Sequence, residues 1–238
     1  MERISDASPR LKARVAGLFY LFTATTGFGV FVRGKLVVDS DAVATTTNIL
    51  AHEPLFRLAF LADLLVNPCF VILTLLFYDL FKPVSRGVSL LAAFFSLAGC
   101  AIASVVCLFE LAPLIVLGGG HNLSAFGVEQ LQALALLFLK LHAQGVNISL
   151  IFFGSYCLLI GYLIFRSTFL PRILGALMAI AGLSYLTNSF ATLLAPAVAA
   201  GLFPYILAPG GVAEVSLILW LLVIGVNASK WREQASTA

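Results

Sequence analysis

Three acidic residues occur inside long apolar stretches of the sequence, where an ionisable side chain is unexpected. They are Asp63, Glu110 and Glu214. An ionisable group near the centre of a membrane-spanning helix costs about 2.5–3.5 kcal/mol on insertion scales, so it is a functional candidate by default. Polar residues of similar interest lie in or beside such stretches: Asn67, His142, Asn147 and Asn188.

The acidic residues share a similar depth in the segments that contain them. At about 1.5 Å per helical residue, Asp63 and Glu110 each lie roughly 10 Å from the outer end of their segments. By the same rise, Glu214 lies roughly 6–9 Å and Asn188 roughly 9 Å from that side. Asp63 and Asn67 are four residues apart and so share one helix face.

We therefore predict a polar intramembrane cavity that opens to the outer side. Its candidate lining residues are Asp63, Asn67, Glu110, His142, Asn147, Asn188 and Glu214, with Arg33, Arg57 and Lys140 as counter-charges. Each of these polar groups also has a purely structural interpretation, because a side chain near a helix end can reach the lipid headgroups or hydrogen-bond a neighbouring helix.

The chemistry open to this set is broad. Carboxylates with a histidine could ligate a metal, and buried carboxyl groups could relay protons. However, the sequence has no pair of histidines at metal-ligand spacing and no Gly-x-Ser-x-Gly nucleophile motif. It therefore predicts neither a metal nor another cofactor.

Three hypotheses of function follow. In the first, a non-enzymatic membrane protein binds or passes a small or lipid-like ligand through the cavity. In the second, a membrane-embedded enzyme uses His142 and the carboxylates as acid, base or metal ligands. In the third, the polar groups pair across the interface of a homo-oligomer. A proton-coupled transporter would need polar groups along the inner half of its pathway as well. The inner half of the predicted bundle is almost purely apolar, which argues against a transporter.

Composition decides the class of protein that must hold these residues. Hydrophobic residues make up 61% of the 238 residues and charged residues only 11%. A soluble domain usually carries about 25% charged residues, so this chain could not cover a water-facing surface. Its net charge of +3 forms no basic stripe interleaved with aromatic residues, which excludes a nucleic-acid site. Membrane lipids are the predicted surroundings.

The chain divides into six apolar segments of spanning length, and the predicted fold is an all-α polytopic transmembrane bundle. The segments are residues 15–32, 56–81, 88–117, 145–165, 172–194 and 210–228. Two further helices are predicted on the outer side. One covers residues 42–52, after candidate caps at 39–41, and the other covers residues 128–144 and leads into the fourth segment.

The distribution of cations predicts the orientation. Ten of the fourteen Lys and Arg residues fall on the side of the N-terminus if the chain crosses six times. Positive residues are enriched in cytoplasmic loops, so both termini are predicted to be cytoplasmic. The whole chain, 1–238, is predicted to be one transmembrane domain, with residues 1–14 and 229–238 as cytoplasmic ends. The four cysteines lie in apolar stretches and are predicted to be packing residues.

Several stretches carry a resemblance to a known family. They run from Arg14 to Tyr20, from Asn48 to Leu64, from Lys82 to Arg86, from Phe152 to Gly175 and from Glu214 to Leu222. Together they resemble the domain of unknown function 4386 family of bacterial multi-pass membrane proteins, over nearly the whole chain. The resemblance implies a location in the bacterial inner membrane. It implies no established activity, so it assigns no catalytic residue.

Overall fold

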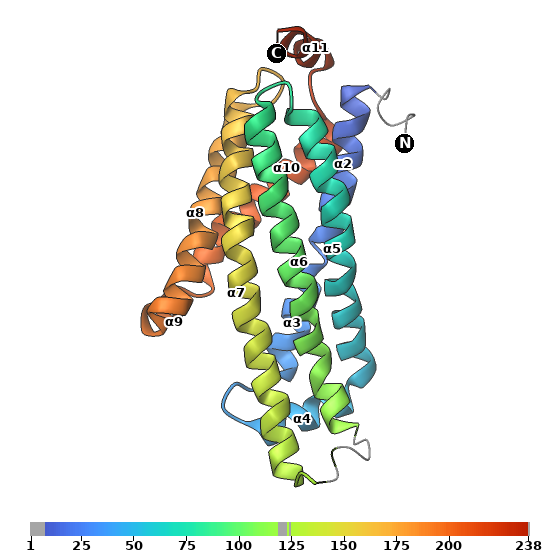
Figure 1. Ribbon diagram of the computed structural model, residues 1–238, viewed down its shortest axis with the longest axis vertical. Helices are drawn as coiled ribbons and strands as arrows, with labels where there is room; N and C mark the ends of the chain where they lie inside the picture. The colour runs from blue at the N-terminus through green and yellow to red at the C-terminus, as the bar shows by residue number, and fades with distance from the viewer. Residues whose placement is uncertain (1–7, 119–122, 124, 238) are drawn as a thin grey trace. The chain divides into compact units, whose positions relative to one another are not determined.

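The part of the chain that the structure describes is helical. The computed structural model describes residues 8–118, 123 and 125–237, and no strand occurs among them. Figure 1 shows the helices in chain order. They are α2 (Pro9–Thr23), α3 (Thr26–Leu36), α4 (Ala42–Ala51), α5 (Glu53–Phe81), α6 (Arg86–Leu117), α7 (Val128–Arg166), α8 (Arg172–Leu194), α9 (Pro196–Leu202), α10 (Ala208–Val223) and α11 (Ala228–Ser236), with a 3₁₀ turn at Tyr205–Leu207.

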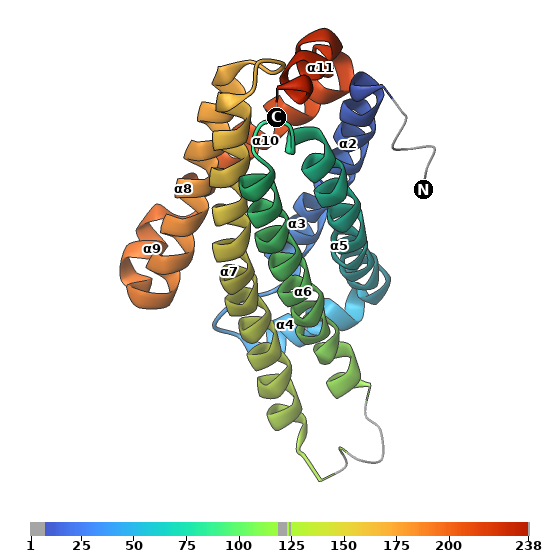
Figure 2. The same cartoon turned by 45° about the horizontal axis from the view of Figure 1, so that its top comes forward.

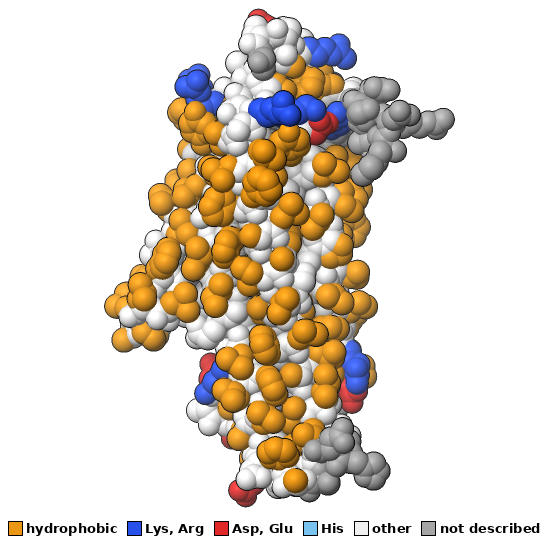
Figure 3. Space-filling view, viewed as in Figure 1, with side chains coloured by type: hydrophobic (Ala, Val, Ile, Leu, Met, Phe, Trp, Pro, Cys, Tyr) orange, Lys and Arg blue, Asp and Glu red, His pale blue; other side chains and the backbone are white. Residues whose placement is uncertain are grey.

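Six helical segments among the described residues are long and apolar enough to cross a membrane. This confirms the predicted all-α class and its six candidate spans. The segments are Pro9–Leu36, Glu53–Phe81, Arg86–Leu117, Val128–Arg166, Arg172–Leu194 and Tyr205–Val223. Hydrophobic side chains cover most of the face seen in Figure 3. On α6, for example, Leu108 is 64% exposed, whereas Glu110 is fully buried, the inverse of a water-soluble helix.

The chain forms two compact units, and helices α5, α6 and α7 contribute residues to both. The first unit comprises Met1–Phe22, Cys69–Cys100 and Asn147–Ala238, and the second comprises Thr23–Pro68 and Ala101–Val146. In the first unit, Figures 1 and 2 show α8 beside α10 and continuing into α9. In the second unit, α3 contacts α4.

Each unit has a hydrophobic core of its own. The first contains edge-to-face aromatic pairs, among them Tyr20 and Phe77, whose ring centroids lie 6.0 Å apart. The second core includes Val32 of α3, Ile49 of α4 and Leu139 of α7. All four cysteines are free thiols, and three of them are buried, as expected of packing residues.

The short helix after the first span forms as the sequence predicts. Asp41 caps α4, with its carboxylate accepting a hydrogen bond from the Ala44 backbone N–H at 2.8 Å. An aspartate at this position satisfies one of the N–H groups that a helix leaves without an internal partner. Pro54 follows the end of α4. It lies in the first turn of α5, where a missing N–H costs nothing.

The first span is longer than predicted and is interrupted. Residues 15–32 were expected, whereas helix covers Pro9–Leu36 with a break between Thr23 and Thr26. The Thr26 hydroxyl donates to the Thr23 carbonyl at 2.9 Å. Hydroxyl side chains that bond the local backbone compete with the regular helical ladder, which accounts for the break.

The helix predicted at 128–144 forms, and it continues without a break into the fourth span, because α7 runs from Val128 to Arg166. Gly145 marks a close approach of α7 to Val106 of α6 and not a helix end. At about 1.5 Å per residue the 39 residues of α7 extend about 58 Å, which exceeds a hydrocarbon core of about 30 Å. The helix α7 is therefore longer than one crossing of such a core requires.

The last span ends earlier than predicted. The helix stops at Val223 and not at residue 228, because Gly225 adopts a φ of 74° that side-chain-bearing residues rarely reach. The tail then forms α11, whose first turn is capped by the Asn227 side chain. The first seven residues of the predicted N-terminal segment, and Ala238, lie outside the described residues.

Candidate functional site

One buried arginine joins two of the predicted carboxylates. Within the second unit, Nη1 of Arg33 on α3 donates to Asp63 Oδ2 on α5 and to Glu110 Oε1 on α6. The side chains of Arg33, Asp63 and Glu110 are 17%, 10% and 0% exposed. Charge-assisted hydrogen bonds of this kind are strong and directional, so Arg33 fixes one oxygen of each carboxylate.

A glycine on α3 makes room for this arrangement. A Cβ atom at Gly29 would lie 2.5–2.7 Å from the carboxylate atoms of Asp63. Arg33 follows Gly29 by four residues and therefore lies on the same face of α3. The absence of a side chain at Gly29 lets α3 approach α5 closely while Arg33 reaches across to both acids.

His142 of α7 completes the cluster, and a backbone carbonyl orients its ring. The side chain is buried, and Nδ1 lies 3.3 Å from the Val106 carbonyl oxygen. Because a carbonyl can only accept, Nδ1 must carry the proton in this contact. In a neutral imidazole Nε2 then holds a free lone pair. Val106 precedes Glu110 by one turn of α6, so the same stretch of helix positions both residues.

Three hydrogen-bond acceptors of this cluster have no donor among the described residues. One possible ligand atom each from Asp63, Glu110 and His142 lies within 4.8 Å of the other two. Asp63 Oδ1, Glu110 Oε2 and His142 Nε2 are buried and have no hydrogen-bond partner among the described residues. We call these three atoms, together with Arg33, the acceptor site.

The acceptor site carries an unbalanced charge when its acids are ionised. Two carboxylates face a single guanidinium, and with neutral His142 the cluster holds one net negative charge. A buried polar atom without a hydrogen-bond partner lowers the stability of the folded protein by about 1–3 kcal/mol, and a charged group lowers it by more. Such a site is suited to a proton, a cation or a small hydrogen-bond donor.

The remaining sequence candidates take other positions. Asn67 is buried on α5, and its amide donates to the Asp63 backbone carbonyl at 3.2 Å. Asn188 of α8 donates to the side-chain oxygen of Asn147 on α7 at 3.0 Å, within the first unit. These amides thus bond the backbone or one another across helices.

Glu214 is not grouped with Asp63 and Glu110. It belongs to α10 of the first unit, where it interacts with Tyr185 and Tyr20. Tyr185 packs against Gly210, one turn before Glu214, and a Cβ atom at Gly210 would clash with its ring. The structure therefore divides the predicted residues between two polar clusters.

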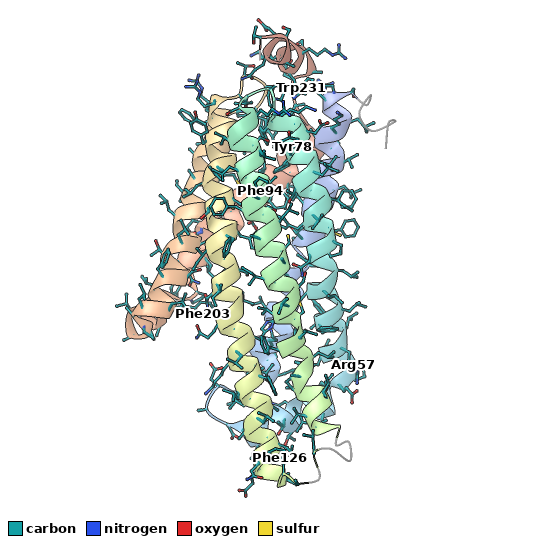
Figure 4. All side chains as sticks on the ribbon, in the orientation of Figure 1. Arg57, Tyr78, Phe94, Phe126, Phe203 and Trp231 are labelled. Carbon is teal, nitrogen blue, oxygen red and sulfur yellow. The ribbon has the colours of Figure 1, made fainter. Side chains whose placement is uncertain are left out.

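Only one of the three predicted counter-charges pairs with the predicted acids. Arg33 does so, whereas Arg57 pairs with Glu53 one turn away on α5 at 2.7 Å. Figure 4 shows Arg57 on the outward side of α5. Lys140 is exposed on α7, and no ion pair of Lys140 occurs among the described residues.

Sequence reasoning treated Arg33 as a cation beyond the end of the first span and missed Gly29 altogether. Arg33 lies inside a helix that continues to Leu36. The available signal was the spacing of Gly29 and Arg33, a small residue and a cation on one helix face within an apolar stretch. The Val106 carbonyl belongs to the backbone, so no side chain in the sequence indicates its role.

Comparison with known proteins gives a family and one distant relative. The family model described as a domain of unknown function (DUF4386) matches residues 15–225. An uncharacterized protein of Archaeoglobus fulgidus is 26% identical over 153 residues, which cover 64% of this chain and 75% of that protein. The relative is archaeal, so the likeness is not confined to the bacteria. No solved structure matches the chain.

Proposed function

We propose, from the premise that the chain belongs to the DUF4386 family, that it is a multi-pass membrane protein which binds a small polar ligand at the acceptor site. The six apolar helices support the membrane assignment. We place both termini on the cytoplasmic side of a cell membrane. The C-terminal end of α3 and the helix α4 then lie on the opposite, outer side. The ligand is one that offers positive charge or hydrogen-bond donors.

The observation that carries this proposal is the set of three buried acceptors without a donor. In folded proteins the great majority of buried polar side-chain atoms have a partner, and each exception calls for an explanation. Here the three exceptions belong to residues that each place one possible ligand atom within 4.8 Å of the other two. A single small ligand would satisfy all of them together.

A purely structural ion pair would explain less of the geometry. Arg33 and one carboxylate would already form a neutral pair that holds α3 against a neighbour. The second carboxylate and a histidine with a free lone pair add cost without adding stability, because polar groups away from water need partners. The excess acceptors are the part of the cluster that a ligand explains.

The spacing also favours a small ligand over a lipid-like one. Asp63, Glu110 and His142 each place a ligand atom close enough to the others to contact a single central atom, such as an ammonium nitrogen, a water oxygen or a metal ion. Gly29 faces Asp63 with no room for another carbon atom. This supports a site for an ion or a molecule of very few atoms.

Native mass spectrometry of the purified protein tests the proposal. We expect a bound mass that survives mild release from detergent and is absent from the Asp63→Asn/Glu110→Gln double variant. Glu53→Gln is the matched control, because it removes a carboxylate from α5 whose side chain is 39% exposed and paired with Arg57. If the double variant and the wild type carry the same bound species, or neither carries one, the acceptor site is not a binding site.

One observation also supports an enzymatic role. The Val106 carbonyl holds His142 in the tautomer that leaves Nε2 able to accept a proton or bind a metal. A general base needs such a lone pair beside the group it deprotonates. Ligand turnover by the wild type, lost in His142→Gln with the ligand still bound, would distinguish this second function from binding alone.

A further inference from the structure

We infer that the ligand of the acceptor site is a divalent transition-metal ion, held by His142 Nε2, Asp63 Oδ1 and Glu110 Oε2. This inference rests on the proposed binding function and names its ligand. It differs from the sequence expectation of no metal, which relied on spacing along the chain. The three donors come from three helices, α5, α6 and α7, so no local spacing could show them.

The donor set selects the class of metal. Imidazole nitrogen suits zinc, iron, nickel and copper, whereas magnesium and calcium take oxygen ligands almost exclusively. One histidine with two carboxylates is a mixed nitrogen and oxygen set of the kind that binds catalytic zinc or non-haem iron. Each of these three atoms has a lone pair that accepts no hydrogen bond from the described residues, so it is free to bind a metal ion.

The surroundings orient all three donors, as a built metal site requires. Arg33 engages Asp63 Oδ2 and Glu110 Oε1, which leaves the other oxygen of each carboxylate free. The Val106 carbonyl engages His142 Nδ1 and leaves Nε2 free. Such outer contacts are typical of metal sites, where they fix the tautomer and direct the lone pairs toward the ion.

The distances allow the site to close around an ion. Nitrogen and oxygen ligands lie about 2.0–2.2 Å from zinc, so neighbouring ligand atoms are about 3–3.6 Å apart. One ligand atom each of Asp63, Glu110 and His142 already lies within 4.8 Å of the other two, and side-chain rotations that move the ligand atoms by about 1–2 Å would bring them to that separation.

The charge of the filled site indicates a further ligand. With a divalent ion, two carboxylates and the Arg33 guanidinium, the site carries one net positive charge. Three protein donors also leave a tetrahedral ion with one open position. Both features suit an anionic fourth ligand, such as hydroxide.

Metal analysis of the purified wild type provides the test. We expect about one equivalent of a transition metal per chain, or, after treatment with a chelator, a rise in melting temperature when Zn²⁺ is added. His142→Ala and Glu110→Gln should each lose the metal or weaken Zn²⁺ binding more than tenfold. His52→Ala is the control, because this exposed histidine lies at the end of α4 and should leave both results unchanged.

The outcomes separate this inference from the proposed function. No metal in the wild type, together with no effect of Zn²⁺, Fe²⁺ or Mn²⁺ on melting, overturns the metal assignment. Equal metal in His142→Ala overturns it too, as does a response to Mg²⁺ as large as that to Zn²⁺. If native mass spectrometry then still shows a non-metal species that depends on Asp63 and Glu110, the binding function stands. If His142→Ala fails to fold, Glu110→Gln decides the question.

Discussion

At the scale of single residues, the cluster on Arg33 holds one acid more than its cation can neutralise. Arg33 engages both Asp63 and Glu110, while Glu110 Oε2 and His142 Nε2 stay without a partner among the described residues. Removing the cation and removing one acid should therefore have very different effects on stability. The first leaves two buried negative charges, and the second leaves a neutral pair.

We predict that Arg33→Gln lowers the free energy of unfolding by about 3–5 kcal/mol, as when one partner of a buried ion pair is removed. Glu110→Gln should change it by less than about 1.5 kcal/mol, since Arg33 and Asp63 still pair. SDS-induced unfolding of the purified protein in mixed micelles measures both. A larger loss in Glu110→Gln than in Arg33→Gln would contradict the charge argument.

The exposed pair of Arg57 and Glu53 is the control for this prediction. The two side chains are 56% and 39% exposed and lie on the same unit as the acceptor site. Surface ion pairs contribute about 0–1 kcal/mol, so Arg57→Gln should have a correspondingly small effect. A loss as large as that of Arg33→Gln would show that any lost cation destabilises the protein.

Gly29 gives a second prediction at this scale. Gly29→Ala places a methyl group against the Asp63 carboxylate and should destabilise the protein by about 1–3 kcal/mol through overpacking. Gly34→Ala, on the same helix but facing open space, should be neutral or stabilising by up to about 1 kcal/mol. Thermal melting in detergent compares the two, and equal effects would show that the α3–α5 approach is not as tight as described.

Much of the site could be anticipated from residue types alone. Asp63, Glu110 and His142 stand out because ionisable groups are costly in apolar helices, and the structure brings these three together. What the sequence could not show is which acids meet, because depth along a helix says nothing about the direction of a side chain. Glu214 has a similar depth, but its partners are Tyr185 and Tyr20 in the other unit.

At the scale of elements, α7 and α8 contact each other backbone to backbone through two glycine pairs. A Cβ atom at Gly161 would lie 2.7 Å from the Gly175 carbonyl oxygen, and one at Gly182 would lie 2.6 Å from that of Gly154. Both pairs belong to the first unit, and their order along the chain shows that the helices are antiparallel. Small residues permit this close packing in membrane bundles.

We predict that Gly161→Ala destabilises the protein by about 1–3 kcal/mol, because backbone atoms of α8 cannot move aside as a flexible side chain would. Gly211→Ala on α10 is the matched control, since nothing lies within 4 Å of the added methyl group. Unfolding in mixed micelles distinguishes them. If Gly161→Ala unfolds no more easily than Gly211→Ala, the two helices are farther apart than described.

The elements also show where sequence patterns succeed and fail. The boundaries of α8 and α6 lie within two residues of the predicted segments, because Pro171 and the turn at Lys82–Arg86 mark them clearly. The unbroken α7 was not foreseen. Its polar first half suggested a helix outside the fourth span, whereas tertiary contacts, such as that of His142 Nδ1 with the Val106 carbonyl, bury part of that half.

At the scale of the whole molecule, six crossings, as we propose for the six apolar helices, would put both ends of the chain on one side of the membrane. The excess of Lys and Arg on the N-terminal side favours the cytoplasm. We predict that a C-terminal fusion to green fluorescent protein is fluorescent, and that alkaline phosphatase fused there is inactive. Phosphatase fused after Gly127 should be active. Activity of the C-terminal phosphatase fusion would reverse the proposed orientation.

The association of the chain with itself and with lipids remains a prediction. A homo-oligomer would bury some of the large exposed hydrophobic residues, which include Phe94 and Leu108 of α6. A lipid bilayer would cover the same residues without any protein partner. The mass of the protein in lipid nanodiscs distinguishes a single chain from an oligomer.

The central claim is that a ligand occupies the space between Asp63, Glu110 and His142, and an electron cryo-microscopy map of the protein in nanodiscs tests it most directly. We predict compact density within about 3.2 Å of Asp63 Oδ1, Glu110 Oε2 and His142 Nε2, the limit for a direct polar contact. Side chains of Asp63 and Glu110 that point apart toward the lipid headgroups, or acceptors that bond only to the protein itself, would contradict it.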